Sequence, residues 1–184
     1  MIKGILVKMK IIVTGSEGLI GSKVLKYLKK NHKVVGLDLT RGVDLSDEKF
    51  IEKLFEKKEY RADVLINLFA KNHHIDKSAQ SSNKIFDISL NSFSEYLHIN
   101  LTTLFSVCRN FAKYNKKSSI INFSSTYGIN PPPTDLYGKD EKHIGYSVSK
   151  SGVIMLTKHL ATHLGPNIRV NCISPGGILN KQKK

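Results

Sequence analysis

The chain has 184 residues, about the length of one domain, so an assembly of several domains is excluded. With 40% hydrophobic residues it can build a core, and no apolar run reaches the roughly 18 residues of a membrane span. The net charge of +14 comes from 25 Lys and four Arg against 15 acidic residues. Because base readout favours arginine, we expect no specific nucleic-acid partner. Because no apolar run is long enough to span a membrane, we also expect no membrane partner and a cytoplasmic location.

Strand-length apolar runs alternate with helical periodicity along the chain, which is typical of a parallel sheet covered by helices on both faces. Expected strands are 10–13, 33–37, 63–67, 119–124 and 168–173, with a short edge strand at 43–45 as a further candidate. Expected helices are 20–28, one that begins at about residue 48, 92–114 and 145–164. The sequence therefore predicts an α/β fold, a three-layer α/β/α Rossmann fold with a doubly wound parallel sheet.

A glycine-rich turn over residues 14–21 lies between the first expected strand and the first expected helix. Gly15 permits a tight turn, Gly18 lets the backbone approach a pyrophosphate, and Gly21 allows the helix to pack close to the strand. The start of the helix then presents free N–H groups and a positive dipole end to the phosphates. The alternative is a glycine-rich turn without a ligand.

Asp38 ends the second expected strand, 23 residues after Gly15. A carboxylate at that place accepts hydrogen bonds from the adenosine ribose and repels a 2′-phosphate. Glu17 adds negative charge on the same side, whereas Arg41 is the one group that could favour a 2′-phosphate. The expected cofactor is therefore NAD, with NADP less favoured, and the alternative for Asp38 is a turn residue after a strand.

Tyr146 and Lys150 lie four residues apart, so a helix places the phenol and the ammonium on one face. A neighbouring cation stabilises phenolate and lowers the pKa of a tyrosine, which makes the pair a candidate proton donor and acceptor. Ser125 follows an expected strand, at the edge where doubly wound sheets bind ligands. Taken alone, each of these residues could be an ordinary surface or strand-end residue.

Together, and in this order, the motifs resemble the short-chain dehydrogenase/reductase family over about residues 9–178. The resemblance implies a catalytic tetrad of Asn100, Ser125, Tyr146 and Lys150. The cofactor contacts that the motifs and the resemblance imply are Gly15, Glu17, Gly18, Leu19, Ile20, Gly21, Asp38, Asp44, Leu45, Asn67, Ala70, Tyr146, Lys150, Pro175, Gly176 and Ile178. Residues 1–184 would then form a single NAD(P)-binding Rossmann domain.

The resemblance also implies a mechanism. Ser125 would hold the substrate oxygen, and Tyr146 would give or take the hydroxyl proton as hydride moves. Lys150 would lower the pKa of the phenol and bind ribose, and Asn100 would carry a proton relay. The expected reaction is the NAD-dependent interconversion of a secondary alcohol and a carbonyl on a small molecule. Residues 145–161 are most similar to members of the bacterial surface-sugar and flagellin-modification type, which implies a sugar or nucleotide-sugar substrate.

The chain stops shortly after the Pro-Gly turn, where the family continues with a substrate lid, a further helix and a last strand. We therefore expect a C-terminally truncated member whose sheet lacks the last strand. The alternatives to an active enzyme are a truncated, catalytically weak or inactive dinucleotide-binding protein and a dinucleotide sensor. A homo-oligomer stays open, because missing elements would leave apolar surface exposed. The expected start is Met1 or Met9.

A metal site is not expected. His159 and His163 have metal-ligand spacing on a helix, but the Glu of a His-Glu-x-x-His motif and a third ligand nearby are both absent. Cys108 and Cys172 lie far apart and form no CxxC pair, which indicates neither a disulfide framework nor a zinc ribbon.

Overall fold

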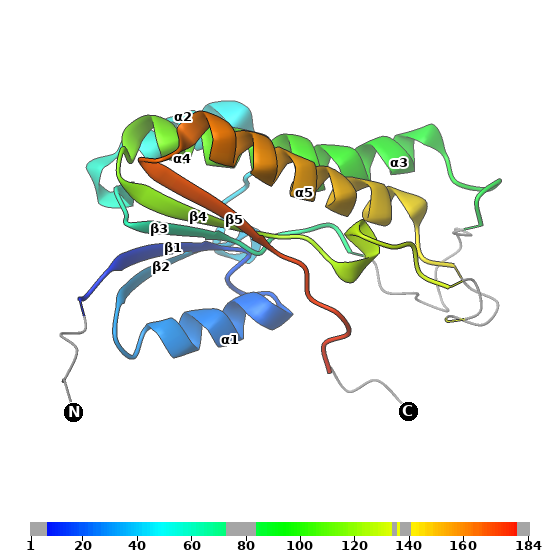
Figure 1. Cartoon of the computed structure of the whole chain (residues 1–184), viewed down its shortest axis with the longest axis horizontal. Helices are drawn as coiled ribbons and strands as arrows, with labels where there is room; N and C mark the ends of the chain where they lie inside the picture. The colour runs from blue at the N-terminus through cyan, green and yellow to red at the C-terminus, as the bar shows by residue number, and fades with distance from the viewer. Residues whose placement is uncertain (1–6, 73–83, 134–135, 137–140, 180–184) are drawn as a thin grey trace.

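The computed structural model describes residues 7–72, 84–133, 136 and 141–179, and a parallel sheet runs through their centre (Figure 1). Its strands are β1 (Lys10–Thr14), β2 (Lys33–Leu37), β3 (Val64–Asn67), β4 (Ser118–Phe123) and β5 (Ile168–Ile173). The spatial order is β2-β1-β3-β4-β5, so the chain winds from β1 to β2 and then crosses back to β3. The carboxyl ends of β1 and β3 border the point where the winding reverses, which is where such sheets bind ligands.

Helices cover both faces of the sheet, which gives the three layers that the sequence predicts (Figure 1). The helices are α1 (Leu19–Leu28), α2 (Glu48–Glu56), α3 (Leu90–Leu97), α4 (Thr103–Tyr114) and α5 (Ile144–Leu164). α1 lies alone on one face, and α2, α4 and α5 lie on the other (Figure 1). None of the helices in the described part of the chain combines the length and the apolar character that crossing a bilayer requires.

Each central strand contributes to two cores, because successive side chains of a strand point to opposite faces. Ile12 and Leu65 belong to the larger core under α2, α4 and α5. Val13 and Ile66 belong to the smaller core under α1. This two-sided burial explains why the strands appear in the sequence as continuous apolar runs.

The edge strand expected at 43–45 does not form. After β2 the chain turns through a short 3-10 helix, η1 (Leu39–Arg41), which ends at Gly42 with φ of 76°. The backbone N–H of Val43 then donates to the carbonyl of Asp38, 3.1 Å away. This closed turn carries the segment away from the edge of β2 and over the carboxyl end of the sheet.

The helix expected over 92–114 is continuous but not regular. α3 and α4 are joined by a π-helical segment, η3 (His98–Thr102), which contains Asn100. A π turn holds one more residue than an α turn and is often found at functional sites. The irregularity therefore falls on a residue that the sequence analysis places in the catalytic tetrad.

Candidate active site

The loop after β1 is packed so tightly that side chains do not fit at two of its glycines. Gly15 has φ of 65°, and a Cβ on it would lie 2.5 Å from the backbone nitrogen of Phe69. A Cβ on Gly21 would lie 2.0 Å from the carbonyl oxygen of Gly15. The glycines therefore bring the loop after β1, the loop after β3 and the first turn of α1 into direct contact.

The start of α1 fits a diphosphate. Gly18 is the N-cap residue, no side chain caps the helix, and the first turn, which begins with Leu19 and Ile20, contains no acidic residue. Gly15 and Gly18 line a cavity at this end of the sheet, so the uncapped helix start borders that cavity. Free N–H groups and the positive end of the helix dipole at a cavity form a ready anion site.

Asp38 connects the loops after β1 and β2. Its carboxylate accepts hydrogen bonds from the Glu17 backbone N–H at 2.9 Å and from the backbone N–H and hydroxyl of Thr40 at 3.0 and 2.8 Å. Burial by itself raises the pKa of Asp38, but these hydrogen bonds and the charge of Arg41 outweigh it and hold the pKa below its usual range. The carboxylate is therefore ionised at neutral pH.

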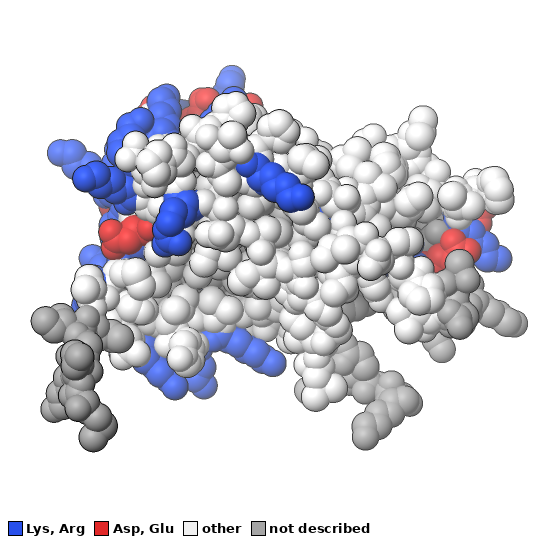
Figure 2. Space-filling view, in the orientation of Figure 1, with Lys and Arg blue, Asp and Glu red and all other residues white. Residues whose placement is uncertain are grey.

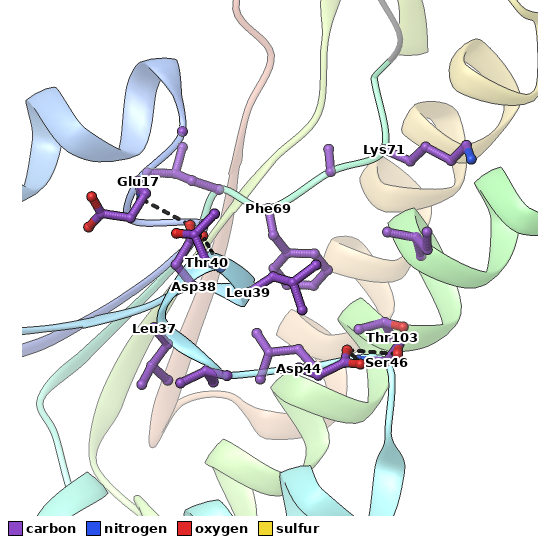
Figure 3. Close-up of a pocket in the computed structure, with 17 residues that line it drawn as sticks. Glu17, Leu37, Asp38, Leu39, Thr40, Asp44, Ser46, Phe69, Lys71 and Thr103 are labelled. Atoms are coloured by element: carbon purple, nitrogen blue, oxygen red, sulfur yellow. Dashed lines mark hydrogen bonds between the residues drawn. The ribbon is translucent and has the colours of Figure 1, made fainter.

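A cavity of about 570 Å³ lies over the carboxyl ends of β1, β2 and β3 (Figure 3). Seven of the predicted cofactor residues line it: Gly15, Glu17, Gly18, Asp38, Asp44, Leu45 and Ala70. The volume lies within the usual range for ligand pockets, roughly 300–1,000 Å³. The cavity is therefore large enough to hold part of a dinucleotide.

Several residues that line the cavity were not predicted: Leu39, Thr40, Phe69, Lys71, Ile99 and Thr103. Leu39 directly follows Asp38, and Phe69 stands in the Asn-Leu-Phe-Ala segment after β3, so position could have indicated both. Figure 3 shows the Phe69 ring between the Asp38 side of the cavity and the helical side. Ile99 and Thr103 carry no such signal, because the π segment decides which side of the helix faces the cavity.

The predicted adenine contact Asp44 lies at the cavity with its carboxylate bound to its own turn. Asp44 accepts hydrogen bonds from the backbone N–H and the hydroxyl of Ser46, at 2.8 and 2.7 Å. These bonds hold the pKa of Asp44 below its usual range, although burial acts slightly against them. The turn that results places Leu45 where it lines the cavity, although the residue is 7% exposed and also belongs to the larger core.

Asn67 lies below the cavity rather than in its lining. Its side-chain oxygen accepts from the Thr14 hydroxyl at 3.0 Å, and its amide nitrogen donates to the Asn122 oxygen at 2.9 Å. The residue is 3% exposed. Its side chain therefore connects the carboxyl ends of β1, β3 and β4 and holds the floor of the site.

The structure brings Ser125, Tyr146 and Lys150 together at the carboxyl end of β4. Ser125 begins the short helix η4 (Thr126–Gly128), and its hydroxyl accepts a 3.1 Å hydrogen bond from the Tyr127 backbone N–H. The same hydroxyl lies close enough to the Tyr146 phenol to favour its ionised form. The Lys150 ammonium lies 5.9 Å from the centre of the Tyr146 ring. This is the arrangement of hydroxyl, phenol and cation that the tetrad requires.

The electrostatics of this group are dominated by burial. Burial raises the pKa of the Tyr146 phenol, and the Ser125 hydrogen bond only partly opposes that effect. Lys150 is 5% exposed, and burial lowers its pKa to about 8. Its ammonium donates a 2.8 Å hydrogen bond to the Phe123 carbonyl, the last residue of β4. In this structure the phenol is therefore neutral at physiological pH, whereas the sequence analysis expects Lys150 to lower its pKa.

Asn100 joins the site through a chain of hydrogen bonds. It is 3% exposed, and its side chain accepts from the Lys71 N–H at 2.7 Å and donates to the Lys71 carbonyl at 3.1 Å. It also donates to the Ser149 hydroxyl at 3.0 Å, and that hydroxyl donates to the Tyr146 carbonyl at 2.8 Å. The sequence analysis did not single out Ser149, although it lies three residues after the tyrosine.

The predicted turn after β5 lies beside η4. The Thr126 backbone N–H donates to the Pro175 carbonyl at 3.0 Å, and a Cβ on Gly176 would lie 3.8 Å from the Thr126 methyl group. Ile178, further along the same segment, is 36% exposed. The turn therefore reaches the carboxyl edge of the sheet next to Ser125.

No group of three or more metal-ligating side chains occurs among the described residues. The rings of His159 and His163 lie 6.2 Å apart on the exposed side of α5. The 570 Å³ cavity and the group of Ser125, Tyr146 and Lys150 therefore lie at the same edge of the sheet.

Comparison with known proteins agrees with this geometry. A family model described as enoyl-(acyl carrier protein) reductase matches residues 19–184. Post-translational flagellin modification protein A of Campylobacter coli is 30% identical over 199 residues, which cover 94% of this chain and 78% of that protein. The probable galactose dehydrogenase of Rhizobium meliloti (strain 1021) is 40% identical over 98 residues, which are half of this chain and only 35% of that protein.

Solved structures share the fold. A short-chain dehydrogenase from Leptospira borgpetersenii with bound NAD+ superposes with a TM-score of 0.81 at 28% identity, over 96% of this chain and 74% of the other. A 4-hydroxyisoleucine dehydrogenase complexed with NADH gives a TM-score of 0.72 at 27% identity, over 92% and 75% of the two chains. The glycine turn, the cavity at the winding reversal, the Ser-Tyr-Lys group and these matches agree. The chain belongs to the short-chain dehydrogenase/reductase family.

Proposed function

We propose that the chain is an NAD-dependent oxidoreductase that interconverts a secondary alcohol and a carbonyl. The observation that carries the proposal is the position of Tyr146, whose phenol is beside Ser125 and whose ring centre is 5.9 Å from the Lys150 ammonium, at the sheet edge that also forms the 570 Å³ cavity. The adenosine half of the cofactor would occupy the cavity, with its diphosphate at the start of α1. The nicotinamide supplies the hydride donor or acceptor when it is bound.

The residues of the chain handle the oxygen and its proton. Ser125 positions the substrate oxygen, and Tyr146, which is neutral, donates its proton to the oxygen during carbonyl reduction. In the opposite direction the phenol must first lose that proton. Because burial raises the pKa of Tyr146, oxidation is expected to need a more alkaline pH than reduction. Asn100 fixes the loop after β3 and, through Ser149, the first turn of α5.

We infer that the cofactor is NAD rather than NADP. The Asp38 carboxylate is ionised and lies where it repels a 2′-phosphate. Arg41, the group that could attract that phosphate, forms an ion pair with Glu17 at 2.6 Å. The solved structures include one relative bound to NAD+ and another to NADPH, so the preference rests on these three residues.

A sugar or a related polyol is the substrate class that we propose. The probable galactose dehydrogenase among the relatives supports this class. No specific nucleic-acid partner is proposed, and Figure 2 shows the Lys and Arg side chains of this face in separate groups rather than in one groove.

The test is cofactor binding followed by turnover. NADH and NADPH are titrated by nicotinamide fluorescence, and D-galactose and xylitol are then offered with NAD. We expect NADH to bind more tightly, and Tyr146→Phe to keep that binding while turnover falls by about 10²–10⁴-fold. A Tyr146→Phe protein with the parent rate would contradict the mechanism, and absence of NADH binding would contradict the function.

A second candidate is a dinucleotide-binding protein with weak or no turnover. The neutral phenol and the bond between Lys150 and the Phe123 carbonyl favour it, since neither group is prepared for alcohol oxidation in this structure. NADH binding without turnover in either direction, at any pH up to about 10, would support this candidate.

A further inference from the structure

His143 holds the first turn of α5, the turn that carries Tyr146. It is the N-cap residue of the helix, and its Nδ1 accepts a 3.0 Å hydrogen bond from the Gly145 backbone N–H. Its carbonyl accepts a 3.0 Å bond from the backbone N–H of Tyr146 itself. Two of the N–H groups that a helix start leaves without helical partners are therefore bound by one residue.

The other side of the His143 ring is fixed by α3. The Ser92 hydroxyl lies 3.0 Å from Nε2, and the Tyr96 ring stacks on the imidazole at 4.3 Å with an angle of 23° between the planes. Ser92 and Tyr96 are four residues apart on one face of α3. A Cβ on Gly145 would lie 3.0 Å from both the imidazole Nδ1 and the Tyr96 Cβ, so the glycine allows the ring to pack against the backbone of α5. His143 is 5% exposed.

These bonds determine the protonation state of the ring. A backbone N–H can only donate, so Nδ1 must be unprotonated, and the proton of neutral imidazole is on Nε2, where it is donated to Ser92. Protonation of Nδ1 would place two donors face to face and remove the cap. Ser, Thr and Asn, three of the usual N-cap residues, do not titrate near neutral pH, whereas this cap is lost when the imidazole is protonated.

We propose that His143 is a positioning residue that sets the place and orientation of Tyr146 by capping α5 in its neutral form. The inference rests on the proposed function, since it assigns the cap to the residue that transfers the proton. Within the part of the chain that the structure describes, the titratable groups near the ring are Tyr96, which stacks on it, and Lys142 and Tyr146 in its own segment. Lys71 lies over the Tyr96 ring and pairs with Glu95. Because protonation of Nδ1 removes the cap, activity is expected to fall once the pH is low enough to protonate the ring, whereas Lys142, whose pKa burial lowers to about 8, titrates on the alkaline side.

Two isosteric substitutions separate the functions of the ring. His143→Asn keeps an acceptor at the Nδ1 position that cannot be protonated, and His143→Gln keeps a donor at the Nε2 position without the cap. His159→Gln, on the exposed side of the same helix, is the matched control. The full-length protein, labelled with ¹³C at the tyrosine Cζ, gives a Tyr146 resonance that is assigned by its loss in Tyr146→Phe.

We expect His143→Gln to shift or broaden the Tyr146 resonance and to speed amide exchange at Gly145 at least tenfold. We also expect kcat to fall at least tenfold, while the KM for NAD stays within about twofold of the parent. His143→Asn should stay within about threefold of the parent at neutral pH and should not show the fall in activity at acid pH, because its amide oxygen cannot be protonated there. A His143→Gln protein like the parent in resonance and exchange would overturn the proposal, as would equal damage in both variants. The Tyr146 resonance and the Gly145 amide exchange can be measured without turnover. An inactive parent would therefore contradict the proposed function, while the capping role of His143 could still be tested.

Discussion

The guanidinium of Arg41 lies 2.6 Å from the carboxylate of Glu17, and the two side chains are 51% and 37% exposed. The arginine that follows Asp38 is therefore paired at the rim of the cavity. Exposed ion pairs contribute roughly 0–1 kcal/mol, so a single substitution releases this one at little cost in stability.

Glu17→Ala should improve NADP binding. Because the backbone N–H of Glu17 is the group that donates to Asp38, the variant keeps that bond and frees Arg41 to meet a 2′-phosphate. We expect the dissociation constant for NADPH to fall about three- to tenfold, roughly 1 kcal/mol, with less than a twofold change for NADH. Fluorescence titration measures both values. In the double variant with Arg41→Ala the gain should disappear, and a gain that persists there would contradict the explanation.

Lys150→Met should stabilise the protein while it removes activity. Lowering the pKa of a buried lysine from 10.5 to about 8 corresponds to about 3 kcal/mol of folding free energy lost at neutral pH. The unfolded chain binds more protons there, so the parent gains stability as pH rises from about 8 to about 10.5. The free energy of unfolding of both proteins is measured in urea at pH 7 and at pH 10.5. Lys150→Met should be the more stable protein at pH 7, and this difference should shrink at pH 10.5. A difference independent of pH would contradict this account of Lys150.

The charge of Lys150 also predicts a pH profile for catalysis. Carbonyl reduction needs the ammonium and the neutral phenol together, and Lys150 loses its charge above about pH 8. The kcat/KM for reduction should therefore fall above about pH 8, tenfold for each pH unit when one proton is involved. Lys150→Arg, which stays charged, should keep a flat profile in that range even where its rate is lower.

Gly21→Ala should abolish cofactor binding. The new Cβ would lie 2.0 Å from the Gly15 carbonyl oxygen, so α1 must move away from the loop that it closes. We expect a stability loss of about 1–3 kcal/mol and a loss of NADH binding of more than tenfold. Gly177→Ala is the control, because nothing lies within 4 Å of its Cβ position. Unchanged NADH binding in Gly21→Ala would contradict the close approach.

Asn100→Ala should separate the loop after β3 from α5. The variant leaves the N–H and the carbonyl of Lys71 without their partner and removes the bond to Ser149. We expect a stability loss of about 2–3 kcal/mol, since buried groups left unpaired cost about 1–3 kcal/mol each. Asn100→Asp keeps the acceptor for Lys71 and should cost less in thermal unfolding. Equal losses would show that the Lys71 bond is unimportant.

The sheet could be predicted from the sequence, because its strands are buried on both faces. Ile12 and Val13, for example, enter different cores, so neither position could be polar. The same holds for the glycine turn, where Gly15 and Gly21 are required by backbone contacts. These features leave a signal in a short stretch of sequence, as an apolar run or a glycine pattern, and can therefore be recognised there. The family and its fold are confirmed by the comparisons.

Features that depend on tertiary contacts were missed. The segment 43–45 has the composition of a strand, but the Gly42 turn and the Asp38 carbonyl direct it to the cavity. The helix over 92–114 has regular apolar spacing, and nothing in it marks the π turn at Asn100. His143 lies in a loop in the sequence and acquires its capping role only when Ser92 and Tyr96 are brought to it.

The π turn at His98–Thr102 makes this helical run sensitive to changes in length. Each residue of an α-helix advances the side-chain direction by about 100°, so removing one residue from the wide turn would regularise the helix and rotate α3 by more than a quarter turn relative to α4. Ser92 and Tyr96 would then face away from His143 while the core residues of α4 stayed in place. We therefore expect single-residue deletions inside 98–102 to abolish function in a deletion scan, whereas substitutions at the exposed His98 should be tolerated.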